Sequence, residues 1–130
     1  MTDDLTDDEL AFLHAAFDLA RGGDSERLAG LLDAGLPVNL TNAGGDSLLI
    51  LASYNLHVGT VRALLDRGAD TSRVNDKGQT ALGAAVFRQS AEIVTALLDA
   101  GADPALGPRS AIEVAQVFDL PEMLALLVED

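Results

Sequence analysis

Few residues of this chain carry side chains of the types that catalyse reactions or bind metals. It has two histidines, His14 and His57, and no cysteine. Without cysteine there is no thiolate nucleophile, no disulfide framework and no Cys-based zinc site, and this composition suits a reducing compartment such as the cytoplasm. The two histidines are not four residues apart on one helix, which is the spacing that zinc-binding helices use. We therefore expect structural roles for both and no bound metal.

The acidic and glycine-rich stretches also lack the spacing that ligand binding needs. The acidic run between Asp3 and Glu9 has neither the spaced oxygens nor the central glycine of a calcium loop, and it is typical of a solvated cap at the positive end of a helix. The glycine pairs at 22–23 and 44–45 are not followed by Lys-Ser/Thr and do not form GxGxxG. Neither pair is a phosphate cradle, so the sequence predicts no cofactor.

Residues 45–48 read Gly-Asp-Ser-Leu and so resemble the signature of the GDSL esterases, in which the serine is the nucleophile. That family takes its general base from an Asp-x-x-His near the carboxyl terminus, but neither His14 nor His57 has an aspartate three residues before it. A serine without a base is not activated. We favour Asp46 as a turn residue and Ser47 as a helix cap. A small hydrolase that uses Ser47 is the alternative from a different functional class.

The elements that must position these residues are short amphipathic helices. The chain is 48% hydrophobic and 22% charged, which allows one domain with a buried core. A helix is predicted to begin at Thr6 with a capping box and to end at the glycines at 22–23, and a second runs from Asp24 or Ser25 to Gly35. Apolar residues recur at helical spacing, and no segment alternates at the two-residue period of a strand. The apolar stripes are Leu10, Leu13, Ala16, Phe17 and Ala20, then Leu28, Leu31 and Leu32.

Most of the chain repeats one segment at a period of 33 residues. Residues 75–104 shifted by that period match residues 42–71 at Asn42/Asn75, Gly45/Gly78, Leu49/Leu82, Ala52/Ala85, Val61/Val94, Leu64/Leu97, Leu65/Leu98, Asp66/Asp99, Gly68/Gly101, Ala69/Ala102 and Asp70/Asp103. A fixed period of this size indicates a stack of repeats. The inner helices are predicted at 47–54 and 80–88, and the outer helices at 58–66 and 91–99. A diverged unit precedes these two, and a closing unit follows after a connection three residues shorter.

The repeated pattern resembles the ankyrin repeat. The family's conserved order is present here as Gly78, Thr80, Leu82, Ala85, Ile93, Val94, Leu97, Leu98, Gly101, Ala102 and Asp103. The resemblance implies an all-α ankyrin-repeat solenoid, a single domain over residues 1–130 with capping repeats at about 6–38 and 105–130 and repeats at 42–74 and 75–104. No unit has both the Pro and the His of the family's Thr-Pro-Leu-His opening. We therefore expect leucine and alanine packing, more than the hydrogen bonds of that histidine, to hold the units together.

The resemblance further implies a non-catalytic protein that binds a partner protein through a concave face, formed by the turn tips and the exposed side of the inner helices. The candidate contacts near the ends of the inner helices are Arg21, Tyr54, Asn55, Phe87, Arg88 and Phe118. Tyrosine and arginine are enriched in binding hot spots. Polar rim contacts are expected from Asp46, Arg73, Asp76 and Lys77 at the tips. The alternative for Tyr54 and Phe87 is that they pack on each other between repeats.

The net charge of the chain limits the classes of partner that we expect. Acidic residues outnumber basic ones 21 to 8, and the net charge of −13 repels nucleic acid and anionic lipid but attracts a basic partner. An inhibitor or immunity-type protein that occludes a basic enzyme or toxin is therefore the alternative to an adaptor, although acids also keep a small protein soluble. The acidic amino terminus does not resemble a secretory signal, and no apolar run approaches the roughly 18 residues of a membrane span. We expect a cytoplasmic monomer.

Overall fold

The computed structural model describes residues 7–128, and over these residues the chain forms eight helices and no strand. Thr6, the predicted cap of the first helix, lies outside the described residues. In chain order the helices are α1 (Asp7–Gly22), α2 (Ser25–Asp33), α3 (Leu48–Tyr54), α4 (Val58–Asp66), α5 (Ala81–Phe87), α6 (Ala91–Asp99), α7 (Ala111–Val117) and α8 (Pro121–Val128). The predicted outer helices at 58–66 and 91–99 are confirmed, and the inner helices differ from the prediction only at their terminal residues.

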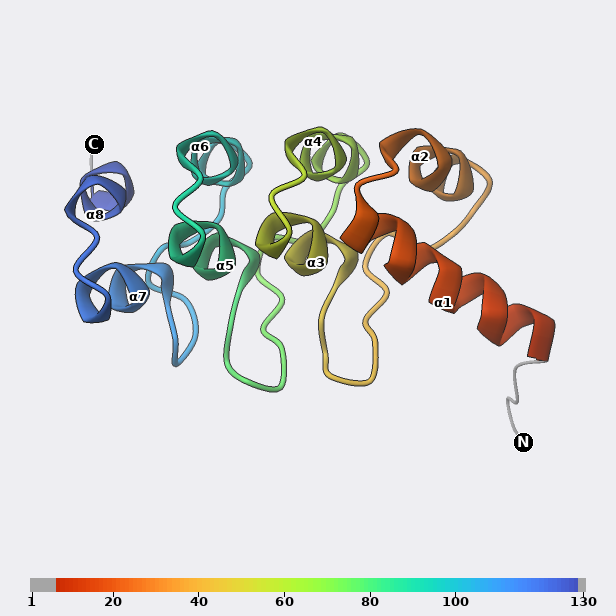
Figure 1. Ribbon diagram of the computed structural model, residues 1–130, viewed down its shortest axis with the longest axis horizontal. Helices are drawn as coiled ribbons and strands as arrows, with labels where there is room; N and C mark the ends of the chain where they lie inside the picture. The colour runs from red at the N-terminus through yellow and green to blue at the C-terminus, as the bar shows by residue number, and fades with distance from the viewer. Residues whose placement is uncertain (1–6, 129–130) are drawn as a thin grey trace.

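The helices stand in two rows, which Figure 1 shows along the long axis of the molecule. The inner row contains α1, α3, α5 and α7, and the outer row contains α2, α4, α6 and α8. Each inner helix packs on the outer helix that follows it, and helices of one row pack on their neighbours in the same row. Three loops project beneath the inner row, between successive helix pairs (Figure 1). The all-α repeat stack expected from the sequence is confirmed.

The inner helices after α1 begin at hydroxyl residues. The side-chain oxygens of Ser47, Thr80 and Ser110 accept hydrogen bonds of 3.1, 3.0 and 3.2 Å from the backbone N–H three residues further on. Each bond satisfies an amide that has no partner within the helix, which fixes where the helix begins. The chain then leaves α3 and α5 through a residue of positive φ, Leu56 at 66° and Gln89 at 60°, which turns it back toward the outer row.

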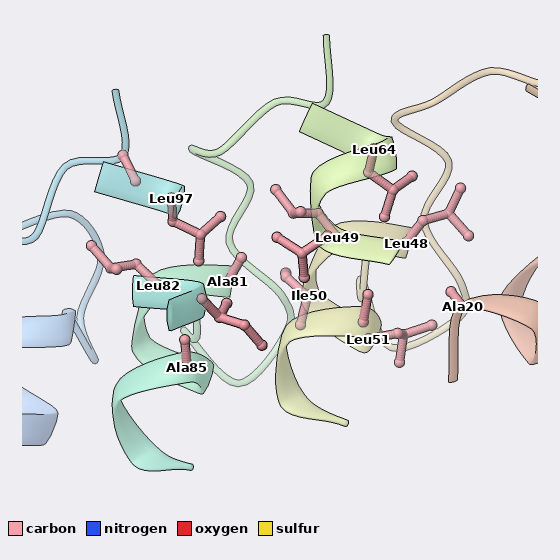
Figure 2. Close-up of a cluster of buried hydrophobic side chains, with 14 of the residues drawn as sticks. Ala20, Leu48, Leu49, Ile50, Leu51, Leu64, Ala81, Leu82, Ala85 and Leu97 are labelled. Atoms are coloured by element: carbon pink, nitrogen blue, oxygen red, sulfur yellow. The ribbon is translucent and has the colours of Figure 1, made fainter. Parts of the chain in front are cut away.

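Leucine and alanine side chains fill the space between the rows (Figure 2). Leu64 and Leu97 from the outer row and Leu48 from the inner row are fully buried. Burying one such side chain contributes about 1.5–3 kcal/mol. The small alanines of the inner row are buried as well and allow these helices to approach closely: Ala20, Ala52, Ala85 and Ala115. Because much of this surface is shared between neighbours, one unit is stable only when the next is folded.

Hydrogen bonds also cross between units, although not from the family's opening histidine. They join Ser25 Oγ to Thr60 Oγ1 at 2.7 Å, His57 Nε2 to the Arg21 carbonyl oxygen at 2.7 Å, Asn75 Nδ2 to Asp46 Oδ1 at 2.8 Å, and the Asp76 amide to the Gly44 carbonyl oxygen at 3.0 Å. The structural role expected for His57 is confirmed by its bond to the preceding unit. Leucine and alanine packing therefore supplies the apolar core, and these bonds set the register between units.

Ion pairs join the first two units and the middle two on the outer side. Arg67 donates from Nε to Asp33 Oδ1 at 2.9 Å and from Nη2 to Oδ2 at 3.2 Å, and Arg62 reaches Glu92 at 3.3 Å. The hydrogen bond from Arg67 holds the pKa of Asp33 below its ordinary value. Both pairs are solvent-exposed, and such pairs contribute little to stability. Their main consequence is orientation of one outer helix against the next.

Candidate functional site

Ser47 is a helix cap and is not positioned as a nucleophile. Its side chain is buried, and Oγ accepts the 3.1 Å hydrogen bond from the Ile50 amide. His57 is engaged through Nε2 with the Arg21 carbonyl oxygen. In the described part of the chain no hydrogen bond joins Ser47 to a histidine. Within residues 7–128 Ser47 therefore has no bonded histidine to act as the general base that a serine nucleophile needs.

Replacing Ser47 by alanine should lower the free energy of unfolding by about 0.5–2 kcal/mol, because the Ile50 amide loses its cap. Ser53 is the matched control, since it is also fully buried on α3 but its Oγ has no hydrogen-bond partner within residues 7–128. Ser53→Ala should leave stability unchanged or raise it by about 1 kcal/mol, because it removes an unsatisfied hydroxyl. Urea melts of the two variants test this, and equal losses would contradict the assigned roles.

The acidic run that the sequence analysis considered as a calcium loop is described only in part. Asp3 and Asp4 of the acidic run lie outside the described residues, whereas Asp7, Asp8 and Glu9 form the exposed first turn of α1. Over residues 7–128 no three His, Asp or Glu side chains gather closely enough to share a metal ion. None of the helices described is both long and apolar enough to cross a lipid bilayer.

Three aromatic residues line up across the inner row, and we call Tyr54, Phe87 and Phe118 the aromatic row. The Tyr54 and Phe87 rings stack with centroids 6.4 Å apart and planes at 7°, and Phe118 meets Phe87 edge-on at 5.2 Å and 71°. Their exposed fractions are 45%, 43% and 55%. Tyr54 and Phe87 therefore pack on each other between repeats, as one of the two alternatives predicted, and each ring still exposes nearly half of its surface.

The repeat places the aromatic row on the outside of the stack. Tyr54 and Phe87 are the last residues of α3 and α5, and each follows a buried alanine, Ala52 or Ala85, by two positions. Two positions along an α-helix rotate a side chain by about 200°, so the residue two after a buried alanine points away from the core. Phe118 is the C-cap of α7 and continues the row in the last unit.

Beside the aromatic row lies a groove of about 470 Å³ along α5 and α7. The small residues Gly83 and Ala84 line its middle. An apolar end is formed by Val114, Val117 and the three rings, and a polar end by Gln79, Arg109 and Glu113. Gly83 allows the two units to approach here, because a Cβ at this position would lie 3.3 Å from the Arg109 carbonyl oxygen.

The remaining inner-helix candidates are engaged to different degrees. Arg88 lies with its guanidinium carbon 5.2 Å from the Tyr54 ring centroid, a cation–π contact. Asn55 donates from Nδ2 to the Leu51 carbonyl oxygen at 2.8 Å and so closes the end of α3. Arg21 is ion-paired with Asp18 at 2.9 Å on α1. The structure therefore gathers Arg88 with the aromatic row, while Asn55 and Arg21 have partners within their own helices.

The candidates at the turn tips also differ in whether they already have a partner within the protein. Asp76 and Lys77 are exposed at the turn before α5. Arg73 is ion-paired at 3.2 Å with the aspartate three residues before it. Asp46 accepts the 2.8 Å hydrogen bond from Asn75, so it links adjacent tips in addition to any rim role.

Sequence reasoning missed Gln79, Arg109 and Glu113 at the polar end of the groove. A signal was present for two of them. Asp46, Gln79 and Arg109 each directly precede the cap of an inner helix, and only Asp46 was singled out from that repeat position.

Comparison with known proteins agrees with the geometry. A family model of three ankyrin repeat copies matches residues 13–106. Over 51 residues the chain is 63% identical to the ankyrin repeat protein PA3287 of Pseudomonas aeruginosa, an alignment that covers 39% of this chain and 30% of that protein. The crystal structure of the human ASB11 ankyrin repeat domain is similar with a TM-score of 0.77 and 31% identity, covering 87% of this chain and 52% of that one. The chain thus spans about half or less of the length of these two relatives.

Proposed function

The chain belongs to the ankyrin repeat family, and we propose that it is a non-catalytic module that binds a partner protein through the inner-helix face, centred on the aromatic row. Ankyrin repeats generally mediate protein–protein interaction. The observation that carries the proposal is the aromatic row itself: a chain that is only 4% aromatic presents three neighbouring rings, each at least 43% exposed. Aromatic residues are enriched at the centres of protein interfaces.

The rings are also held in place before a partner arrives. Phe87 contacts both Tyr54 and Phe118, and the Arg88 guanidinium lies over the Tyr54 ring. Side chains already restrained in the free protein lose less rotamer entropy on binding, so more of the contact energy appears as affinity. The groove beside the row offers a recess into which a partner side chain fits.

Phe87→Ala tests the proposal. A partner captured from native lysate at low salt, and identified by mass spectrometry, should bind this variant about 2 kcal/mol more weakly, roughly a 30-fold rise in Kd. The free energy of unfolding should fall by about 0.5–1.5 kcal/mol from the lost ring contacts, leaving the variant folded at the assay temperature. Val128→Ala is the control, because Val128 is 58% exposed on the outer helix α8 and should not affect binding. Unchanged affinity after replacing all three rings would rule out this face.

An inhibitor that occludes a basic enzyme or toxin is the second candidate, and the net charge of −13 is the observation that favours it. Such a field speeds the approach of a basic partner without requiring any particular contact. Association rate constants should then fall as salt rises, because the Debye length shrinks from about 10 Å at 0.1 M to about 3 Å at 1 M. A rate constant independent of salt would exclude charge steering and favour an adaptor.

A further inference from the structure

Three basic side chains within residues 7–128 have no carboxylate partner: Lys77, Arg88 and Arg109. The other five of the eight basic residues are all ion-paired: Arg21, Arg27, Arg62, Arg67 and Arg73. With 21 acidic residues and eight basic ones, most acids must stay unpaired, so an unpaired acid carries little information. The composition does not require any basic side chain to stay unpaired, so the positions of the unpaired basic side chains are informative.

One of the three unpaired cations lines the groove, and the other two are close to lining residues in space or in sequence. Arg109 lines its polar end, and Arg88 sits over Tyr54 at the aromatic end. Lys77 lies two residues before Gln79, which also lines the polar end. Glu113 is the one acid among the lining residues, and no ion pair joins it to Arg109. Arg109 therefore lines the polar end of the groove, and its side chain makes no hydrogen bond or ion pair within residues 7–128.

We infer that the groove receives an extended segment of a partner protein that carries one large apolar side chain and, about three residues away, a carboxylate. The inference rests on the proposed protein-binding role of the inner-helix face. The apolar side chain packs against Phe87, Val117 and Phe118, and the carboxylate accepts hydrogen bonds from Arg109. Arginine binds carboxylates through two parallel N–H donors, which gives both affinity and orientation.

The spacing follows from the length of the groove. Its two ends are separated by the seven residues of α7, which is about 10 Å at a rise of about 1.5 Å per residue. An extended chain advances about 3.3 Å per residue, so about three residues bridge the aromatic end and Arg109. This local preference is compatible with a partner whose overall surface is basic, because long-range charge governs the encounter and the groove contacts one short segment.

Panning a display library of random 12-residue peptides on the wild-type protein tests the inference. The enriched peptides should share a large apolar residue with Asp or Glu about three positions away, in either chain direction. A synthetic peptide of that consensus should bind Arg109→Gln at least about tenfold more weakly, the effect expected for one charge-assisted hydrogen-bonding group. Arg27→Gln is the matched control, an exposed arginine on α2 away from the groove, and should keep wild-type affinity. Arg109→Glu should instead enrich peptides with Lys or Arg at the same spacing.

The outcomes separate this inference from the proposed function. Peptides that lose affinity for Phe87→Ala but carry Lys or Arg, and bind Arg109→Gln normally, overturn the carboxylate inference and leave the aromatic row as the binding surface. Two other outcomes would overturn the inference together with the proposed binding role of the inner-helix face. In the first, the peptides bind Phe87→Ala and Phe118→Ala as well as they bind the wild-type protein. In the second, the library yields no peptide whose binding depends on the groove. Thermal melts should show that Arg109→Gln folds normally, because the Arg109 side chain makes no hydrogen bond within residues 7–128.

Discussion

Leu97→Ala should lower the free energy of unfolding by about 2–5 kcal/mol, the range for deleting a leucine from a well-packed core. Leu97 is fully buried on α6. Its side chain points toward α5, near Leu82 and Ala81 (Figure 2). The loss combines the transfer of the missing methyl groups to water with the cavity that remains, because helices held on both sides cannot collapse into the gap. Since the third helix pair is packed on both the second and the fourth, its weakening should lower the cooperativity of the whole stack.

Asp99→Ala is the control for Leu97→Ala. Asp99 lies two residues further along α6, is exposed, and makes no ion pair in the described part of the chain. Its replacement should change stability by no more than about 0.5 kcal/mol. Urea melts followed by circular dichroism measure both variants. Similar urea midpoints for the two variants would mean that the buried and exposed faces of α6 are assigned wrongly.

The helical stack could be predicted from the sequence because its signals are local and repeated. Ser47 and Thr80 mark where α3 and α5 begin, and the apolar positions of the outer helices keep the same phase across the period of 33 residues. Repetition makes these signals reliable, because a pattern that two units share is not an accident of one segment.

The contacts between units could not be predicted, because they depend on how far one unit is rotated against the next. The position of Asp46 in a turn was evident, but its hydrogen bond to Asn75 arises only when successive tips lie side by side. The period placed Tyr54 and Phe87 in equivalent positions without giving the distance between their rings. The outcome, stacked and still nearly half exposed, required the geometry.

The groove was missed for a reason that lies in the last unit. The connection before α7 is shorter, so the residue equivalent to Gln79 is Arg109, an offset of 30 and not 33. The equivalence follows from the caps Thr80 and Ser110, and backbone pairing between Gln79 and Arg109 places the two residues side by side. The position of Arg109 directly before the cap of α7 was a usable signal, but the shorter connection takes it out of the 33-residue register. Arg109 and Glu113 line the groove only because α7 packs against α5.

Gly45→Ala should cost about 2–5 kcal/mol, the second large effect, and it tests the approach of neighbouring tips. Gly45 has φ of 81°, and an added Cβ would lie 3.0 Å from the Asp76 amide nitrogen and 3.2 Å from the Asn75 Cα. These are backbone atoms of the next unit, which cannot rotate away, so an overpacking cost of about 1–3 kcal/mol adds to a conformational cost of about 1–2 kcal/mol.

Gly68→Ala separates the two contributions to Gly45→Ala. Gly68 has nearly the same φ, 83°, but a Cβ there would meet nothing within 4 Å. Its replacement should therefore cost only the conformational part, about 1–2 kcal/mol. The difference between the two variants in urea melts measures the contact between tips. The Gly45→Ala variant should also weaken the 3.0 Å hydrogen bond from the Asp76 amide to the Gly44 carbonyl oxygen, and faster amide exchange at Asp76 would report it. Equal costs for the two glycines would mean that adjacent tips do not touch in solution.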